Sequence, residues 1–157
     1  MGGELDGPAA CGAPTALNVY VDSSVLLRVV LGEPGRLRIW SKITAAVASE
    51  LITVECLRTI DRARIHLRLE DEEVADRRAD VLELIETFSL VPVGPPVLER
   101  ASTPFPTMLG SLDAIHLASA LLVRDAFEDL SLATHDHELA VAARAMGFRV
   151  HGSPSSA

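Results

Sequence analysis

Four carboxylates in this 157-residue chain stand where an apolar segment stops or where a helix is expected to begin: Asp22, Glu55, Asp113 and Asp136. Each lies within two positions of a small hydroxyl residue, in order Ser23, Thr53, Ser111 and Thr134. A single acid at such a position has an ordinary explanation, because a carboxylate can cap a helix N-terminus and is favoured by the helix dipole. Four of them in one chain are less easily explained by capping, and they are therefore candidate site residues.

The chemistry open to these carboxylates follows from their charge. Like charges brought close together raise one another's pKa until one is protonated, unless a cation neutralises them. Carboxylate oxygens favour a hard cation such as Mg²⁺, with Mn²⁺ as a substitute, over zinc. Such an ion binds substrate phosphate, stabilises charge on the phosphoryl oxygens and makes a bound water more acidic. If the four acids converge, they indicate hydrolysis of phosphodiester bonds.

The hydrophobic pattern indicates which elements would position these acids. Short apolar runs predict strands at residues 17–21, 51–52, 89–93, 130–134 and 148–150. Helical spacing predicts helices at residues 25–31, 36–49, 53–67, 70–88, 97–101, 112–123 and 136–146, with Thr53 as an N-cap. This alternation favours an α/β fold whose parallel sheet is covered by helices on both faces. Asp22 and Asp136 would then emerge at the same edge of the sheet, which is the edge where such folds bind ligands.

Length and composition fit a single domain. Residues 1–16 are rich in Gly, Ala and Pro and are expected to be a disordered extension, residues 17–151 to form the domain, and residues 152–157 a flexible tail. No apolar stretch is long enough to cross a bilayer and the N-terminus lacks a signal-peptide pattern, so we expect a cytoplasmic protein. Cys11 and Cys56 are too few for a disulfide framework and are expected to be reduced thiols.

The net charge of −8 argues against a nucleic-acid partner, but its distribution is uneven. Residues 28–68 hold eight basic side chains against four acidic ones, whereas residues 69–157 hold six basic against fifteen acidic. A basic half beside an acidic half leaves a nucleic-acid partner open. Ordinary solvated helix faces are the other explanation of the same pattern.

The chain resembles the PIN-domain ribonucleases, and within them the VapC-type toxins of bacterial toxin–antitoxin pairs, in four motifs that occur in the family's order. The motifs are Val19-Tyr-Val-Asp22-Ser-Ser-Val-Leu-Leu27, Ser49-Glu-Leu-Ile-Thr-Val-Glu55-Cys-Leu-Arg58, Ser111-Leu-Asp113-Ala-Ile-His-Leu-Ala118 and Ala133-Thr-His-Asp136. Each motif alone is short, whereas four in order form a specific signal that spans roughly residues 18–151. The resemblance implies a PIN-like three-layer α/β/α fold with a central parallel sheet of four or five strands.

The resemblance also implies a Mg²⁺-dependent endoribonuclease whose acidic quartet corresponds to Asp22, Glu55, Asp113 and Asp136. In the family the first and third acids are the usual metal ligands, so Asp22 and Asp113 are expected to bind the metal. Glu55 and Asp136 would complete the charge cluster, orient water or hold a second ion.

Further expectations concern the surroundings of the quartet and its partners. Ser23 and Ser24 are expected to cap the first helix and to leave Asp22 free for the metal, and Thr134 and Ser24 are candidate supporting hydroxyls. The family implies an RNA substrate, a homodimer and a small VapB-like antitoxin that covers the site. One departure is Gly110, where many relatives carry a basic residue.

Several other side chains leave alternatives open. His116 is expected to be a structural helix histidine rather than a site residue, and His135 and His137 are expected to point apart rather than to bind a metal together. Arg58 would either pair with Glu55 on the same helical face or contact RNA. The apolar side chains of the helix expected at residues 36–49 would form core, a dimer surface or an antitoxin groove. They are Leu37, Trp40 and Ile43.

The main rival function is a PIN-like module that has lost catalysis and binds RNA or protein. Two other enzyme classes with an acid after the first strand fit less well. A haloacid-dehalogenase-type phosphatase would need an aspartate at Ser24, and a receiver domain would need a late lysine, whereas the only lysine is Lys42. Retention of all four acids favours the nuclease.

Overall fold

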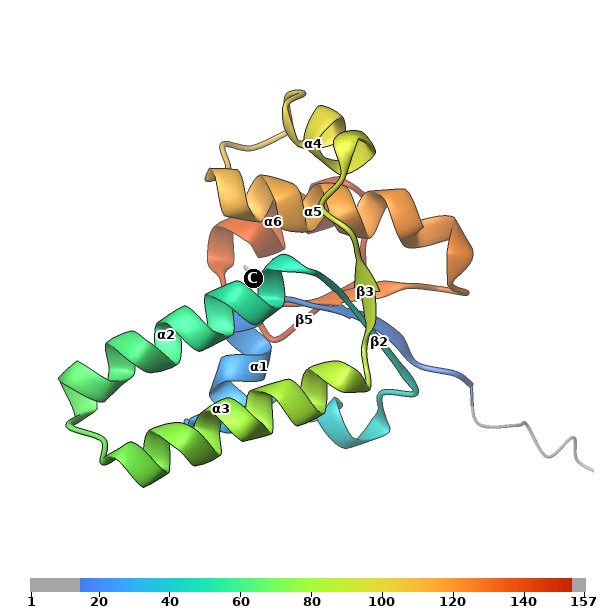
Figure 1. Ribbon diagram of the computed structural model, residues 1–157. Coiled ribbons are helices and arrows are strands. Elements are labelled where there is room, and N and C mark those ends of the chain that lie inside the picture. Colours follow the sequence, from blue (N-terminus) through green and yellow to red (C-terminus); the bar gives the residue numbers. More distant parts are fainter. Residues whose placement is uncertain (1–14, 154–157) are drawn as a thin grey trace, which may run out of the picture.

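A parallel sheet of five strands forms the centre of this computed structural model, which describes residues 15–153 (Figure 1). The strands lie in the order β3-β2-β1-β4-β5. They are β1 (Asn18–Val21), β2 (Ala45–Ser49), β3 (Ser89–Val91), β4 (Ser131–Ala133) and β5 (Val150–His151). Strand β1 is central, and its Val19 is in register with Ala46 of β2 and Ser131 of β4. The fold class predicted from the sequence is confirmed.

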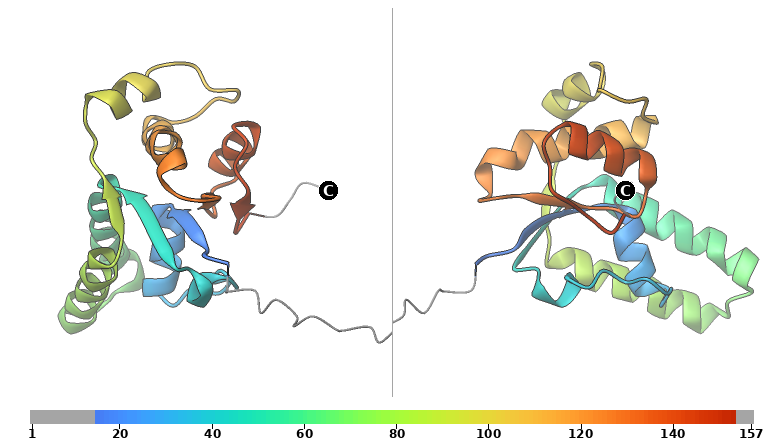
Figure 2. Two further views of the ribbon diagram at one scale, coloured as in Figure 1. Left: turned by 90° about the vertical axis from the view of Figure 1, so that its right-hand side faces the viewer. Right: turned by 180° about the vertical axis from the view of Figure 1, so that it is seen from behind.

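Helices cover both faces of the sheet (Figures 1 and 2). One layer contains α1 (Ser23–Val30), α2 (Leu51–Leu67) and α3 (Asp71–Glu86). The other contains α4 (Pro95–Ala101), α5 (Ser111–Val123) and α6 (His137–Ala145). Two single 3₁₀ turns, η1 (Trp40–Lys42) and η2 (Arg124–Ala126), lie in the connections. Within residues 15–153, no helix combines the length and the apolar character needed to cross a membrane.

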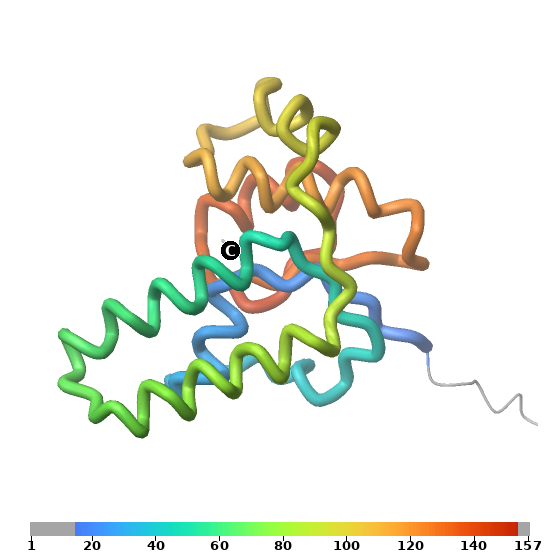
Figure 3. The backbone as a smooth tube through the Cα atoms, in the orientation of Figure 1, coloured from blue at the N-terminus to red at the C-terminus, as the bar shows by residue number. Residues whose placement is uncertain are grey.

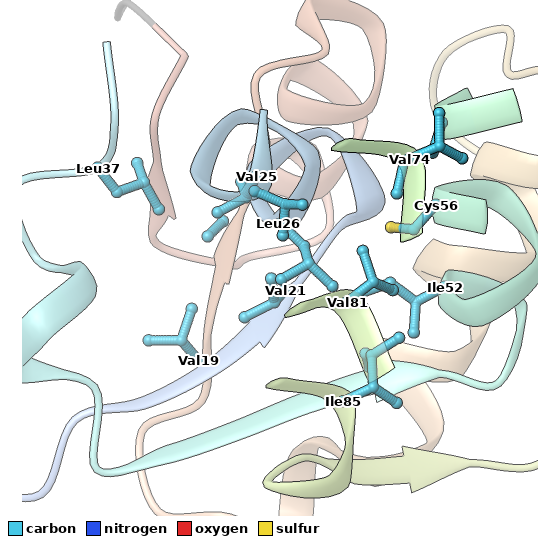
Figure 4. Close-up of a cluster of buried hydrophobic side chains, with 14 residues drawn as sticks. Val19, Val21, Val25, Leu26, Leu37, Ile52, Cys56, Val74, Val81 and Ile85 are labelled. Atoms are coloured by element: carbon cyan, nitrogen blue, oxygen red, sulfur yellow. The ribbon is translucent and has the colours of Figure 1, made fainter. Parts of the chain in front are cut away.

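Alternation along β1 divides the interior into two cores. Successive side chains of a strand point to opposite faces. Val19 and Val21 therefore join the core beneath α1, α2 and α3, which Figure 4 shows, whereas Tyr20 joins the core beneath α5 and α6. All three side chains are fully buried. The strand that ends at Asp22 is thus held rigidly from both sides.

The long helices α2 and α3 form an antiparallel hairpin whose joined end projects beyond the sheet (Figure 3). Helix α2 ends at Arg68, which adopts a left-handed conformation with φ 52°. Helix α3 then begins with a capping box between Glu70 and Glu73 and an acidic first turn, an arrangement that satisfies the free backbone N–H groups and suits the helix dipole. The hairpin supplies one wall of the site through the first turns of α2.

The segment between α1 and α2 differs from the sequence-based prediction. The helix expected at residues 36–49 is instead a loop, the turn η1 and strand β2, and the strand expected at residues 51–52 is the first turn of α2. Helix α2 is preceded by Glu50 rather than capped by Thr53, and Glu50 accepts a hydrogen bond from the backbone of Val93 at 3.1 Å. Strand β2 forms because it lies between β1 and β3, where its backbone is paired on both sides.

The sequence predicts that Trp40 lies on an α-helix, but in the structure it does not. It is half-buried at the first position of the 3₁₀ turn η1 and packs against the core beneath α1, α2 and α3 together with Ile43. Leu37, which precedes the turn, is buried in the same core. The interpretation of these residues as core therefore applies to Leu37 in full and to Trp40 in part.

Candidate active site

Asp22 follows β1 directly and is the N-cap of α1. Its Oδ2 accepts hydrogen bonds from the backbone N–H of Ser24 at 3.4 Å, the hydroxyl of Ser24 at 2.6 Å and the hydroxyl of Thr134 at 2.9 Å. The prediction that Ser23 and Ser24 cap the helix is therefore wrong: the aspartate is the cap, because it stands at the last extended position before the helix. All three bonds go to one oxygen. The other, Oδ1, faces His116 Nε2 at 3.8 Å.

Thr134 joins the ends of β1 and β4. Its hydroxyl donates to Asp22 and accepts from the backbone N–H of Asp136 at 2.9 Å. The backbone N–H of Asp22 in turn donates to Ala133 O at 3.0 Å. Asp136 is the N-cap of α6 and uses Oδ1 to accept from Leu139 N at 2.8 Å. Asp22 and Asp136 thus lie at the same edge of the sheet, as expected for the ends of parallel strands.

Glu55 reaches the site from the second turn of α2, and His116 reaches it from α5. His116 Nε2 lies 2.5 Å from Glu55 Oε2, and the imidazole is fully buried. Burial by itself lowers the pKa of His116, but the hydrogen bond with Glu55 and the charge of Asp22 outweigh it and raise the pKa above its usual value.

The sequence predicts a structural role for His116, whereas the structure places its imidazole between two of the candidate acids, Asp22 and Glu55. The available signal was its spacing of three residues from Asp113, which puts both on one face of α5. That spacing could not reveal which way the face points, because the orientation of α5 depends on its packing between α4 and the sheet.

Asp113 lies in the first turn of α5, with Gly110 as the N-cap. Its pKa is raised to about 6 by burial, then by the charges of Asp136, Asp22 and Glu55, while His116 opposes the rise. A side chain at position 110 would begin 3.8 Å from Asp113 Oδ2. The structure therefore brings Asp22, Glu55 and Asp136 close enough to Asp113 for their charges to act on it.

The donor set fits a hard divalent cation. The side chains that face one another at this edge offer carboxylate and hydroxyl oxygens, which suit Mg²⁺ and Mn²⁺. Burial and then the charges of the neighbouring acids raise the pKa of Asp113, and a bound cation would offset both effects. The nearby thiol of Cys56 is buried beside Ser23 O, and burial raises its pKa to about 12, so it is not a thiolate ligand. In the described part of the chain, no three Asp, Glu, His or Cys side chains converge closely enough to hold an ion by themselves. Mg²⁺ is commonly bound by one or two carboxylates with waters completing its shell.

The neighbouring side chains have other roles. His135 turns its Nδ1 toward Gly152 O at 3.1 Å, and the exposed His137 begins α6, so the two do not form a joint ligand set. Pairing of Arg58 with Glu55, one of the two alternatives left open by the sequence, is not observed. The Arg58 guanidinium instead lies 3.8 Å from Asp61. A groove beside the site is lined by Ser23, Val54, Glu55, Arg58, Arg62 and Leu112.

Comparison with known proteins gives consistent matches. The PIN domain family matches residues 19–145. The chain is 30% identical over 140 residues to Ribonuclease VapC47 of Mycobacterium tuberculosis, an alignment that covers 88% of this chain and 98% of that protein.

Two solved structures are similar in fold. One is a toxin–antitoxin complex from Klebsiella pneumoniae, with a TM-score of 0.56 and 18% identity, covering 78% of this chain and 91% of that chain. The other is VapC20 of Mycobacterium tuberculosis, a toxin that cleaves the sarcin–ricin loop, with a TM-score of 0.56 and 16% identity, covering 84% and 97% of the two chains. At these identities the likeness shows the shared fold.

Proposed function

Because the chain belongs to the PIN domain family, we propose that it is a metal-dependent endoribonuclease and the toxin of a toxin–antitoxin pair. The observation that carries this proposal is that Asp22, Glu55 and Asp136 lie close enough to the half-buried Asp113 for their charges to add to the effect of burial, which together raise its pKa to about 6. Near-complete alignment with Ribonuclease VapC47 supports the substrate class.

Asp22 and Asp113 would hold the metal. Asp22 is suited to this because its Oδ2 is occupied by hydroxyl and backbone donors, which fixes the carboxylate and leaves Oδ1 toward the site. A bound Mg²⁺ or Mn²⁺ supplies charge stabilisation for the phosphoryl oxygens and lowers the pKa of water. Glu55, fixed by His116, and Asp136, fixed by Leu139 N, orient water and add negative charge around that position.

RNA would approach along the groove beside Glu55. Arg58 and Arg62, one helical turn apart on α2, are exposed there and can neutralise backbone phosphates. Leu112 and Val54 line the same groove and are also exposed, which suits contact with bases. The overall negative charge of the chain is compatible with this, because α2 carries basic side chains next to the acidic site.

Cleavage of a fluorescently labelled RNA pool in Mg²⁺, and again in EDTA, tests the enzyme. We expect cleavage that requires the metal and is lost in Asp22→Asn and Asp113→Asn proteins purified in the same way, which controls for contaminating nuclease. If well-folded protein binds RNA but leaves every pool intact in Mg²⁺ and Mn²⁺, the assignment as an enzyme fails and a catalytically silent binding module replaces it.

The partners are also part of the proposal. The Klebsiella pneumoniae neighbour is a toxin–antitoxin complex, which supports a VapB-like antitoxin for this chain. An antitoxin segment with a basic side chain would neutralise the negative charge of the four acids, as a bound metal ion would. Co-expression with its cognate VapB-like antitoxin should give a stable complex without RNase activity, and light scattering of the chain alone should report a homodimer. Absence of any complex would contradict the antitoxin assignment.

A further inference from the structure

Three buried groups connect the backbone of β2 to the candidate site. Ser49 N lies 3.1 Å from the hydroxyl of Tyr20, that hydroxyl lies 3.2 Å from His116 Nδ1, and His116 Nε2 lies 2.5 Å from Glu55 Oε2. Tyr20, His116 and Ser49 are all fully buried. The line of contacts runs through the core beneath α5 and crosses to α2 in the opposite layer.

The direction of each hydrogen bond follows from the donors available. A backbone N–H can only donate, so the Tyr20 oxygen accepts from Ser49. The hydroxyl hydrogen of Tyr20 then has two neighbours, Ser119, whose own hydroxyl donates to Ile115 O at 2.8 Å, and His116 Nδ1. The imidazole nitrogen is the stronger base of the two, so it accepts the hydrogen. Burial and the charge of Asp22 raise the pKa of Tyr20 far above its usual value, so this hydrogen is retained. A neutral imidazole that accepts at Nδ1 carries its own hydrogen on Nε2, and that hydrogen faces Glu55.

We infer that His116 is a positioning residue that holds the Glu55 carboxylate in the site, and that the Tyr20 hydroxyl on Nδ1 and the Glu55 carboxylate on Nε2 together fix the tautomer in which His116 does so. The enzymatic consequence of this inference rests on the proposed function. The tautomer and its dependence on Tyr20 do not.

The surroundings of Glu55 show why such a residue is needed. Glutamate has three rotatable side-chain bonds, and the Glu55 side chain is 19% exposed at the edge of a groove. Within the described chain, His116 provides the hydrogen bond that this carboxylate makes. Arg58, one turn further along α2, is turned toward Asp61. Without the imidazole, Glu55 would be free to swing toward solvent.

Two substitutions at position 116 separate positioning from packing. His116→Gln keeps an N–H donor of similar reach, whereas His116→Met keeps the volume and removes the donor. We expect kcat for RNA cleavage to fall about 10- to 100-fold in His116→Met with little change in KM, as is common when a partner of a metal-site carboxylate is lost. His116→Gln should recover most of the loss. His66→Gln, far along α2, serves as the control and should match the wild type.

A double substitution tests whether His116 acts through Glu55. Glu55→Gln should cost much less activity in the His116→Met background than in the wild type, because the carboxylate is already displaced. Equal losses in His116→Met and His116→Gln, or fully additive losses in the double variant, would overturn the positioning role.

Nitrogen-15 NMR of the imidazole tests the tautomer without any measurement of activity. At alkaline pH, where the ring is neutral, the wild type should show the hydrogen on Nε2, and Tyr20→Phe should shift the population toward Nδ1–H. A wild type with the hydrogen on Nδ1, or a Tyr20→Phe spectrum unchanged from it, would overturn the inference. If the wild type shows the expected tautomer but cuts no RNA, the proposed function fails and the hydrogen-bond assignment stands.

Discussion

The two oxygens of the Asp22 carboxylate have different surroundings. Oδ2 accepts from Ser24 and Thr134 and caps α1, while Oδ1 faces His116. From the sequence alone, helix cap and site acid are alternative roles for Asp22. In the structure the two roles are compatible, because each involves a different oxygen. A carboxylate fixed through one oxygen presents the other in a constant orientation. Such a carboxylate is a better metal ligand than one that rotates freely.

Two substitutions should separate these roles. Asp22→Asn keeps a carbonyl oxygen for Ser24 and Thr134 and remains a good N-cap, so its free energy of unfolding should stay within about 1 kcal/mol of the wild type while RNA cleavage is lost. Asp22→Ala removes the cap and leaves two hydroxyls without their acceptor, which should cost about 1–3 kcal/mol. Urea denaturation measures the difference. Equal stabilities for the Asn and Ala variants would contradict the capping role.

The raised pKa of Asp113 predicts opposite effects of pH on activity and stability. Its pKa in the folded protein is about 6, compared with 3.8 in an ordinary peptide. A metal ligand must be deprotonated, so cleavage should decline as the pH falls through 6. The folded protein, however, binds this proton more tightly than the unfolded chain, so the metal-free fold should become more stable as the pH falls from 6 toward 4.

Asp113→Asn isolates this contribution. After allowance for solvent screening of a half-buried group, the variant should be about 1–2 kcal/mol more stable than the wild type at pH 7.5 without metal, and the advantage should vanish near pH 4. Urea unfolding at both pH values measures it. An advantage that persisted at pH 4 would point to packing rather than charge.

At the scale of elements, the sequence predicted the parts of the fold that carry their own signal. Strands β1 and β4 are apolar runs that end at a polar residue, and the stripe of α5 is continuous. Strand β2 contains three alanines in five residues and has little strand propensity, so it could be identified only from its place between β1 and β3. The proximity of the four acids could be predicted from their positions in the chain, whereas the contact of His116 with Glu55 could not, since it depends on how two helices from different layers meet.

The turn after β5 shows how one element supports another. Gly152, which the sequence places in a flexible tail, has φ +96°, and its carbonyl oxygen contacts His135 Nδ1. A Cβ at this position would lie 2.7 Å from Thr134 O and 2.8 Å from Leu37 Cδ2. Residues 1–14 and 154–157, which hold most of the expected extension and tail, lie outside the described part of the chain.

Gly152→Ala should therefore destabilise the protein more than an ordinary glycine substitution. Gly32→Ala is the matched control, because Gly32 also has a positive φ, +67°, but a Cβ added there would meet no atom within 4 Å. We expect Gly32→Ala to lower the free energy of unfolding by about 1 kcal/mol, and Gly152→Ala to lower it by about 1–2 kcal/mol more than that. Because Thr134 holds Asp22, the second variant should also weaken Mg²⁺ binding, measured by calorimetry. Equal effects of the two substitutions would contradict the close packing at Gly152.

At the scale of the whole molecule, the site is a point of internal repulsion in a chain of net charge −8. Its four acids come from both helical layers and from two strands, so any ligand that neutralises them also links these elements. A divalent cation and a basic antitoxin segment would both act in this way. Binding and stability should therefore be coupled.

Adding Mg²⁺ should raise the melting temperature. At ten times its Kd, a ligand that binds only the folded state contributes about 1.4 kcal/mol, which corresponds to roughly 3–6 °C for a domain of this size. EDTA should reverse the shift. Asp22→Asn and Asp113→Asn should show little of it, and differential scanning fluorimetry measures all three proteins. An equal shift in the wild type and both variants would place the ion elsewhere.

The strand order also sets when the site can exist. Thr134, which holds Asp22, is separated from it by 112 positions in the chain, and β1 gains its neighbour β4 only when that late segment is available. A ribosome adding roughly 5–20 residues per second needs about 6–22 seconds to make the intervening chain. During that interval the nascent polypeptide carries Asp22, gains Glu55 and then Asp113, and still lacks Asp136. The cell that makes this protein is thus exposed to a complete set of acids only at the end of each round of synthesis.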